Sequence, residues 1–116
     1  LDAVPGARAR AAKGEVKVGT IETWLIWKLT GGASHVTDAT NASRTSLMDL
    51  ATRNWRPDLA ALFNVPIAVL PEIRGCAEPL GDCDPSLFGA ALPIHGAAGD
   101  QQAALVGHGA LKAGDA

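Results

Sequence analysis

Apolar side chains recur at helical spacing over residues 20–29 and predict the best-defined helix of the chain. The stripe is broad and includes Trp24 and Trp27, so the helix is expected to be buried on more than one side, with both tryptophans in the core. Thr20 is the predicted N-cap. Gly31-Gly32 is expected to end the helix because glycine readily adopts the left-handed conformation that closes helices.

Three other segments have helical character. Residues 5–15 are polar and alanine-rich and are interpreted as the end of a helix followed by a loop. Residues 57–64 carry one apolar face and begin with Pro57, whose missing N–H does no harm in a first helical turn. A small-residue-rich helix is predicted from Asp100 to about Gly107.

Between these helices the pattern favours extended chain. Threonine, valine and other strand-forming residues predict a strand near 34–38, a turn around Asn41 and a second strand near 44–50. Closely spaced prolines then separate further short strands, expected near 69–73, 78–82 and 92–97. The mixture of helices and strands indicates an α/β or α+β protein.

Composition limits the classes of function. The 116 residues are 47% apolar and 19% charged, with a net charge of -2, which indicates one folded domain rather than a disordered chain. The sequence has no basic patch of the kind that binds nucleic acid, and no apolar run approaches the roughly 18 residues that span a bilayer. No signal-peptide pattern is present. The chain begins at Leu1 and stops without a closing element, so it is expected to be an excerpt of a longer protein.

Several possible motifs carry little chemistry. Cys76 and Cys83 have neither a CxxC nor a zinc-site spacing; two reduced thiols are favoured, and a disulfide stays open. The three histidines do not share a metal-ligand spacing. Residues 109–116 have the glycine spacing of a P-loop but lack its lysine and Ser/Thr, so this motif is rejected.

The strongest candidate for chemistry is Asp100. It lies in Gly99-Asp100-Gln101-Gln102-Ala103-Ala104-Leu105, where a predicted strand ends in a glycine turn and opens into a helix. Such junctions carry ligand-binding groups in α/β proteins because a rigid scaffold holds the loop. From spacing alone, a plain helix N-cap is an equally good interpretation of Asp100.

Three blocks of sequence resemble glycerol kinases. They are residues 19–32, with Gly-Thr-Ile-Glu-Thr-Trp-Leu-Ile-Trp-Lys-Leu-Thr-Gly-Gly, residues 37–45, with Thr-Asp-Ala-Thr-Asn-Ala-Ser-Arg-Thr, and residues 99–105. The resemblance implies an α/β, ribonuclease-H-like (actin-like ATPase) fold of two domains around an ATP cleft. Residues 1–106 would be the later part of the first domain. Residues 107–116 would begin the connection to a second domain that this chain does not contain.

The resemblance also implies a reaction, the transfer of the γ-phosphoryl group of ATP to glycerol to give sn-glycerol 3-phosphate, with Mg²⁺. Asp100 would be the catalytic aspartate, a glycerol ligand and a group near the metal, and Gln101 would hydrogen-bond glycerol hydroxyls. A helix N-terminus favours the charged form of Asp100 and makes it a weak base, so it is expected to orient the hydroxyl first and accept its proton second. No nucleotide-binding residue is assigned here, and the isolated chain is expected to be inactive.

The same resemblance implies a cytoplasmic enzyme that forms a homo-oligomer, binds no nucleic acid and does not insert into membranes. Residues 85–91 lack the arginine with which some relatives bind fructose 1,6-bisphosphate, so inhibition by that ligand is expected to be weak or absent. Two alternatives stay open: a kinase for another polyol or sugar, and a non-catalytic homologue that kept the fold.

Overall fold

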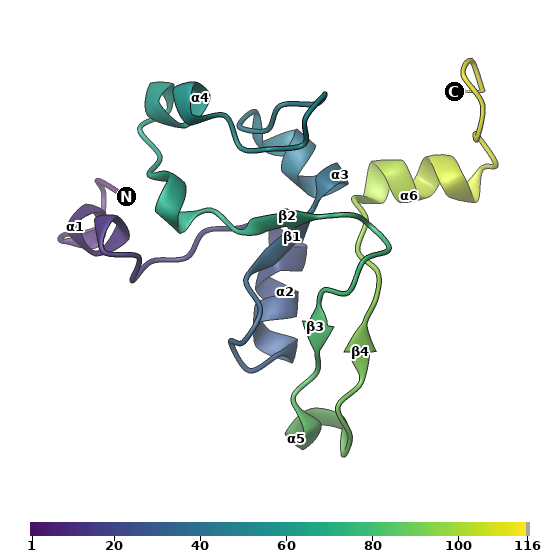
Figure 1. Cartoon of the computed structure of the whole chain (residues 1–116), viewed down its shortest axis with the longest axis horizontal. Helices are drawn as coiled ribbons and strands as arrows, with labels where there is room; N and C mark the ends of the chain where they lie inside the picture. Colours follow the sequence, from purple (N-terminus) through teal and green to yellow (C-terminus); the bar gives the residue numbers. More distant parts are fainter. Residues whose placement is uncertain (116) are drawn as a thin grey trace.

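The computed structural model describes residues 1–115 of the chain. Short helices alternate with very short strands along the sequence (Figure 1). The α-helices are α1 (Ala7–Ala12), α2 (Ile21–Leu29), α3 (Ala39–Ala42), α4 (Pro57–Leu62), α5 (Pro85–Phe88) and α6 (Asp100–Gly107). The 3₁₀ helices are η1 (Ser43–Thr45) and η2 (Ile67–Val69), and the strands are β1 (Val36–Asp38), β2 (Glu72–Arg74), β3 (Gly81–Asp82) and β4 (Pro93–Ile94).

Two small two-stranded sheets organise the molecule. β1 and β2 are parallel, with Thr37 opposite Ile73 in the register, and they lie at the centre of the molecule next to α2 (Figure 1). β3 and β4 form an antiparallel hairpin that extends away from the centre, with α5 at its tip (Figure 1). The chain then returns along β4 toward β1 and enters α6.

Helix α2 has the predicted boundaries. Thr20 is its N-cap residue, although the hydroxyl bonds to Glu22 Oε1 at 2.5 Å instead of capping the helix. Gly31 and Gly32 have φ angles of 61° and 87°, and the Gly32 amide closes the helix by donating to Trp27 O at 2.8 Å. A side chain at Gly32 would be strained by its backbone conformation and would also crowd the Trp27 ring.

The expected burial of α2 on several sides is wrong for the described chain. Only Thr23 and Ile26 are buried in this helix, Trp27 is half-buried, and Trp24 is 55% exposed. The apolar periodicity correctly located the helix, but no other part of residues 1–115 covers its outer face.

The predictions for residues 39–50 need correction. The turn expected around Asn41 is helix α3, and the strand expected near 44–50 begins as η1 and then makes only an isolated bridge between Met48 and Trp55. The cause lies in Asp38, whose side chain accepts from the Thr40 and Asn41 amides and starts a helical turn. Local capping therefore overrides the strand preference of the threonines that follow.

The other elements are shorter than expected. The helix predicted over 57–64 ends at Leu62, and the helical turn of residues 5–15 is α1. Of the expected strands, 69–73 is displaced to Glu72–Arg74 after η2, while 78–82 and 92–97 shrink to the two-residue strands β3 and β4. The helix predicted from Asp100 to Gly107 is confirmed as α6.

A small apolar cluster connects the central sheet with the hairpin. Ile26 of α2, Val36 of β1 and Leu80 just before β3 are buried together, and Ile94 and Ala97 pack against them. This cluster supports the return segment from β4 to α6, because Ala97 lies only three residues before Asp100.

The molecule is open rather than compact. It measures 47 × 41 × 22 Å, and its radius of gyration of 15.9 Å exceeds the about 13 Å of a compact domain of this length. Its accessible surface of 7426 Å² likewise exceeds the about 5,900 Å² expected for a folded monomer of this mass. None of the helices within residues 1–115 has the length and apolarity needed to span a membrane.

Leu80 tests the importance of the apolar cluster. It is 0% exposed, so Leu80→Ala should lower the free energy of unfolding by about 3 kcal/mol through lost burial and a cavity. Leu50→Ala is the matched control, because Leu50 is 75% exposed and should cost less than about 0.5 kcal/mol. Urea unfolding of the complete polypeptide that carries this chain measures both values, and equal losses would contradict the assignment of the core.

Candidate functional site

Asp100 begins helix α6 at the predicted junction. Gly99 is the N-cap residue, so Asp100 occupies the first helical position and not the cap itself. Its carboxylate is exposed, and Oδ1 accepts a hydrogen bond from the backbone N–H of Gln101 at 2.8 Å. Gln101 is also exposed, whereas Gln102 is half-buried, with its amide oxygen turned toward Gly99. The structure thus presents one carboxylate and one amide side by side at the surface.

The segment before Asp100 is tied to the centre of the molecule by its backbone. The Ala97 amide donates to Cys76 O at 3.1 Å, and the Gly99 amide donates to Thr40 Oγ1 at 2.7 Å. Gly99 is buried, although both of its neighbours in the chain are exposed. The second bond joins positions 59 residues apart, so it is a tertiary contact that sets where α6 begins.

Asp38, at the end of β1, is the centre of this contact. It is 0% exposed, and its carboxylate accepts from the Thr40 amide at 2.7 Å, from Asn41 Nδ2 at 2.6 Å and from the Thr40 hydroxyl. Cys76 Sγ donates to it at 3.4 Å. A buried carboxylate needs such donors because removal from water otherwise disfavours its charge.

These contacts determine the protonation states of Asp38 and Cys76. Burial acts to raise the pKa of Asp38, but the hydrogen bonds from Asn41, Thr40 and Cys76 together outweigh it and hold the pKa below its ordinary value. Burial and the neighbouring Asp38 carboxylate raise the pKa of the Cys76 thiol. Asp38 is therefore ionised and Cys76 protonated at neutral pH, as the S–H donor requires.

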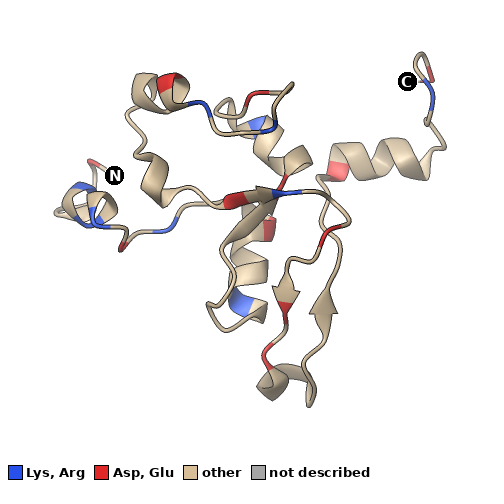
Figure 2. Ribbon diagram, in the orientation of Figure 1, with Lys and Arg blue, Asp and Glu red and all other residues tan. Residues whose placement is uncertain are grey.

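The segment of the chain that carries Asp100 contains no lysine or arginine. Residues 75–111 include no lysine or arginine, and Figure 2 shows acidic but no basic positions on the β3–β4 hairpin and α6. Arg74 lies just before this stretch and pairs with Glu72 at 3.1 Å. Lysine or arginine side chains that neutralise an anionic ligand near Asp100 would therefore have to come from outside residues 75–111.

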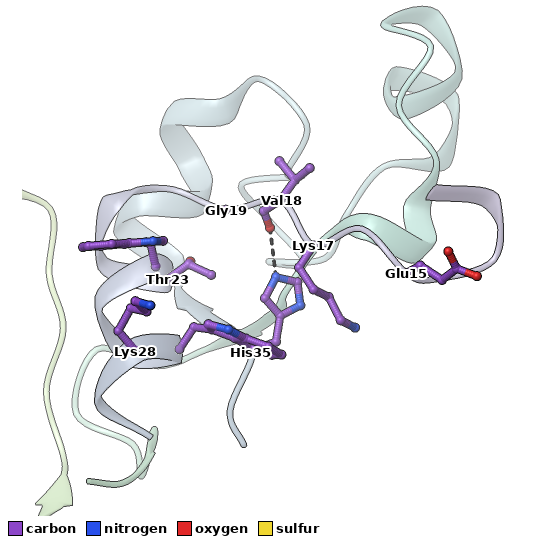
Figure 3. Close-up of a pocket in the computed structure, with 9 residues that line it drawn as sticks. Glu15, Lys17, Val18, Gly19, Thr23, Lys28 and His35 are labelled. Carbon is purple, nitrogen blue, oxygen red and sulfur yellow. Dashed lines mark hydrogen bonds between the residues drawn. The ribbon is translucent and has the colours of Figure 1, made fainter. Parts of the chain in front are cut away.

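A surface hollow lies apart from Asp100, beside α2. Its volume is about 600 Å³, and Figure 3 shows His35 in its wall with the ring bonded to Val18 O at 2.9 Å. Burial lowers the pKa of His35 despite that bond, which keeps the ring neutral near pH 7. Neither Asp100 nor Gln101 lines it; the lining residues are Glu15, Lys17, Val18, Gly19, Thr23, Trp24, Trp27, Lys28 and His35.

Cys76 and Cys83 are both free thiols. Within residues 1–115, no cluster of three or more histidine, cysteine, aspartate or glutamate side chains could hold a metal ion. The sequence analysis missed the roles of Asp38 and Thr40. The local signal was the aspartate at the end of a predicted strand, because aspartate is a common N-cap residue and here caps the helical turn that begins at Ala39.

Comparison with known proteins decides the family. Residues 1–107 match the N-terminal domain of the FGGY family of carbohydrate kinases. The chain belongs to this family. It is 57% identical to a glycerol kinase of Xanthobacter autotrophicus over 114 residues, which cover 98% of the chain and 23% of that relative. The chain therefore spans about a quarter of the length of such relatives.

Solved structures agree with this assignment. A Plasmodium falciparum glycerol kinase with ADP is similar over 90% of the chain and 21% of its own length, with a TM-score of 0.84 and 38% identity. A xylulose kinase from Brucella ovis is similar over 83% of the chain and 20% of its own length, with a TM-score of 0.75 and 27% identity. The predicted resemblance to glycerol kinases and the α/β, actin-like ATPase fold class are both confirmed.

The lowered pKa of Asp38 predicts a specific acid sensitivity. A carboxyl whose pKa is lower in the folded state stabilises the fold above its unfolded pKa of about 3.9 and loses that contribution as pH falls through the folded value. Asp38→Asn should therefore destabilise the protein at pH 7, and the stability gap to the wild type should narrow below about pH 4. Urea unfolding from pH 7 to pH 3 measures the gap; a constant gap would contradict the prediction.

Proposed function

We propose that this chain is part of an ATP-dependent glycerol kinase, which transfers the γ-phosphoryl group of ATP to glycerol and yields sn-glycerol 3-phosphate. The observation that carries the proposal is the exposed Asp100-Gln101 pair at the start of α6, in a chain 57% identical to a curated glycerol kinase. The better fit to a glycerol kinase structure than to a xylulose kinase structure supports glycerol over a sugar substrate.

Asp100 has the geometry of an orienting group. Its Oδ1 accepts a hydrogen bond from the backbone N–H of Gln101, so the carboxylate is held at the helix start. Oδ2 has no hydrogen bond within residues 1–115. Oδ2 can accept a hydrogen bond from a glycerol hydroxyl and so direct the oxygen of that hydroxyl at the γ-phosphorus. A carboxylate is a weak base for an alcohol, but a loose transition state releases that proton late, so positioning is the larger contribution.

Gln101 would select the substrate. Its amide offers both a donor and an acceptor next to Asp100, which suits a polyol whose neighbouring hydroxyls each need a partner. An analogue lacking such a hydroxyl would leave the amide unpaired, which disfavours binding.

The free Asp100 oxygen also fits a role near Mg²⁺, which proteins often hold by one or two carboxylates together with substrate phosphates. When bound, the metal would neutralise charge on the transferring phosphoryl group. Asp100 would hold the metal or one of its waters, and no residue of this chain is proposed to bind the nucleotide. The cations that phosphoryl transfer needs are absent from residues 75–111, so they would come from the rest of the enzyme.

The architecture of the whole enzyme follows from the same proposal. Residues 1–106 would be the later part of the first kinase domain, and residues 107–116 the start of the connection to the second. The apolar surface left open on α2 and α6 would be covered by those other parts. The complete enzyme is proposed to be a cytoplasmic homo-oligomer, and this chain alone would be inactive.

Asp100→Asn tests the proposal directly. In the complete polypeptide, kcat for ATP-dependent glycerol phosphorylation should fall by about 10²–10⁴-fold, because the near-isosteric amide cannot take the hydroxyl proton. Asp82→Asn is the matched control, an exposed aspartate on β3 whose loss of charge should leave kcat unchanged. A wild type inactive on glycerol but active on another polyol would move the proposal to that substrate, and activity on none would favour a non-catalytic homologue.

Gln101→Ala tests the substrate contact. Removing one hydrogen-bonding side chain should raise KM for glycerol about tenfold, equivalent to about 1.4 kcal/mol, and leave KM for ATP unchanged. Steady-state kinetics with each substrate varied in turn gives both constants. Equal changes in the two constants would mean that Gln101 acts on the fold and not on glycerol.

A further inference from the structure

The hydroxyl of Thr40 connects a buried charge to the backbone beside the proposed catalytic residue. It donates to Asp38 Oδ2 and accepts from the Gly99 amide at 2.7 Å. A hydroxyl has a single proton. The Gly99 N–H can only donate and the ionised Asp38 can only accept, so the Thr40 hydroxyl accepts from Gly99 and directs its proton at Asp38.

Asp38 reaches the same segment by a second route. The Cys76 thiol donates to the carboxylate at 3.4 Å, and the carbonyl oxygen of Cys76 accepts from the Ala97 amide at 3.1 Å. Both connections converge on residues 97–99, immediately before Asp100. The carboxylate is fully buried, so solvent does not compete for it.

Helix α6 has few other supports in this chain. None of its residues is buried, and it projects from the centre of the molecule (Figure 1). Its first turn is therefore held in place mainly through Gly99, the buried N-cap residue. A displacement of that residue moves the next one, Asp100, and shifts of about 1 Å at a reacting group can cost about 10²-fold in rate.

We propose that Asp38 and Thr40 are positioning residues, which fix the Gly99 backbone and through it the Asp100 carboxylate in the alignment required for phosphoryl transfer. The proposal rests on the function proposed above. Neither residue touches the substrate; Thr40 transmits the position of the buried Asp38 to the start of α6.

Substitutions at Thr40 separate this role from simple stabilisation. Thr40→Val keeps the shape and removes the hydroxyl, whereas Thr40→Ser keeps the hydroxyl. The matched control is Thr30→Val, because the buried Thr30 hydroxyl likewise makes two hydrogen bonds: it donates to Ile26 O at 2.8 Å and accepts from the Ser34 backbone amide at 3.1 Å. Thr30 is the C-cap residue of α2, and its hydroxyl bonds only to Ile26, Trp27 and Ser34 within residues 1–115, not to the segment before Asp100.

The experiment measures kcat, KM and urea unfolding for these variants in the complete polypeptide. Thr40→Val is expected to lower kcat about tenfold with little change in KM for ATP, and Thr40→Ser to restore kcat to within about twofold of the wild type. Thr30→Val is expected to lose stability without losing kcat. A kcat for Thr40→Val equal to that of Thr30→Val would overturn the proposal.

A double variant adds a test that a structural role would not pass. If Thr40 acts through Asp100, Thr40→Val should lower kcat little or not at all in the Asp100→Asn background. A full tenfold loss in that background would overturn the positioning role. The two proposals fail differently: Asp100→Asn without effect sinks the proposed function and this inference with it, whereas a strong Asp100→Asn effect beside a normal Thr40→Val sinks this inference alone.

Discussion

The buried carboxylate of Asp38 is the interaction on which the arrangement around Asp100 depends. A charge with no exposed surface persists only where donors surround it, and its donors come from the start of α3 and from Cys76 after β2. Satisfying that carboxylate therefore forces the end of β1, the first turn of α3 and the exit of β2 to meet at one point. Two of these donor residues, Thr40 and Cys76, in turn accept hydrogen bonds from the Gly99 and Ala97 backbone amides in the segment that leads into α6.

Apolar and polar contacts both position the segment before α6, and they do so in different ways. Ile26, Val36 and Leu80 hold α2, the central sheet and the hairpin together, with Ala97 at their edge. Apolar contact is not directional and fixes only the approximate path of the chain. The hydrogen bond from Gly99 to Thr40 then fixes direction, because its strength falls steeply as donor and acceptor lose alignment. Asp100 and Gln101 follow directly in the sequence, and both residues are exposed.

Sequence alone predicted the features that depend on local pattern. Apolar spacing and a glycine pair located α2, and the glycine turn located α6 and Asp100. The strand expected near 44–50 was wrong because β-preference is realised only where a partner strand exists, and here the Asp38 cap starts a helical turn first. The Thr40–Gly99 bond could not be predicted, since its partners lie 59 residues apart and the sequence holds no local trace of the pairing.

The distribution of charge indicates which share of a kinase reaction this chain can supply. Phosphoryl transfer needs an aligned acceptor hydroxyl and positive charge around the phosphates. Under the proposed function, residues 75–111 would provide Asp100 and Gln101 for the hydroxyl, and they contain no lysine or arginine for the phosphates. A lysine or arginine beside Asp100 would pair directly with the carboxylate, whereas the Mg²⁺ proposed nearby would be shared with substrate phosphates or held through a water. A segment without lysine or arginine leaves the exposed Asp100 carboxylate free of ion pairs from its own neighbours in the chain, and in that segment a hydrogen bond to the Thr40 hydroxyl sets the position of Gly99.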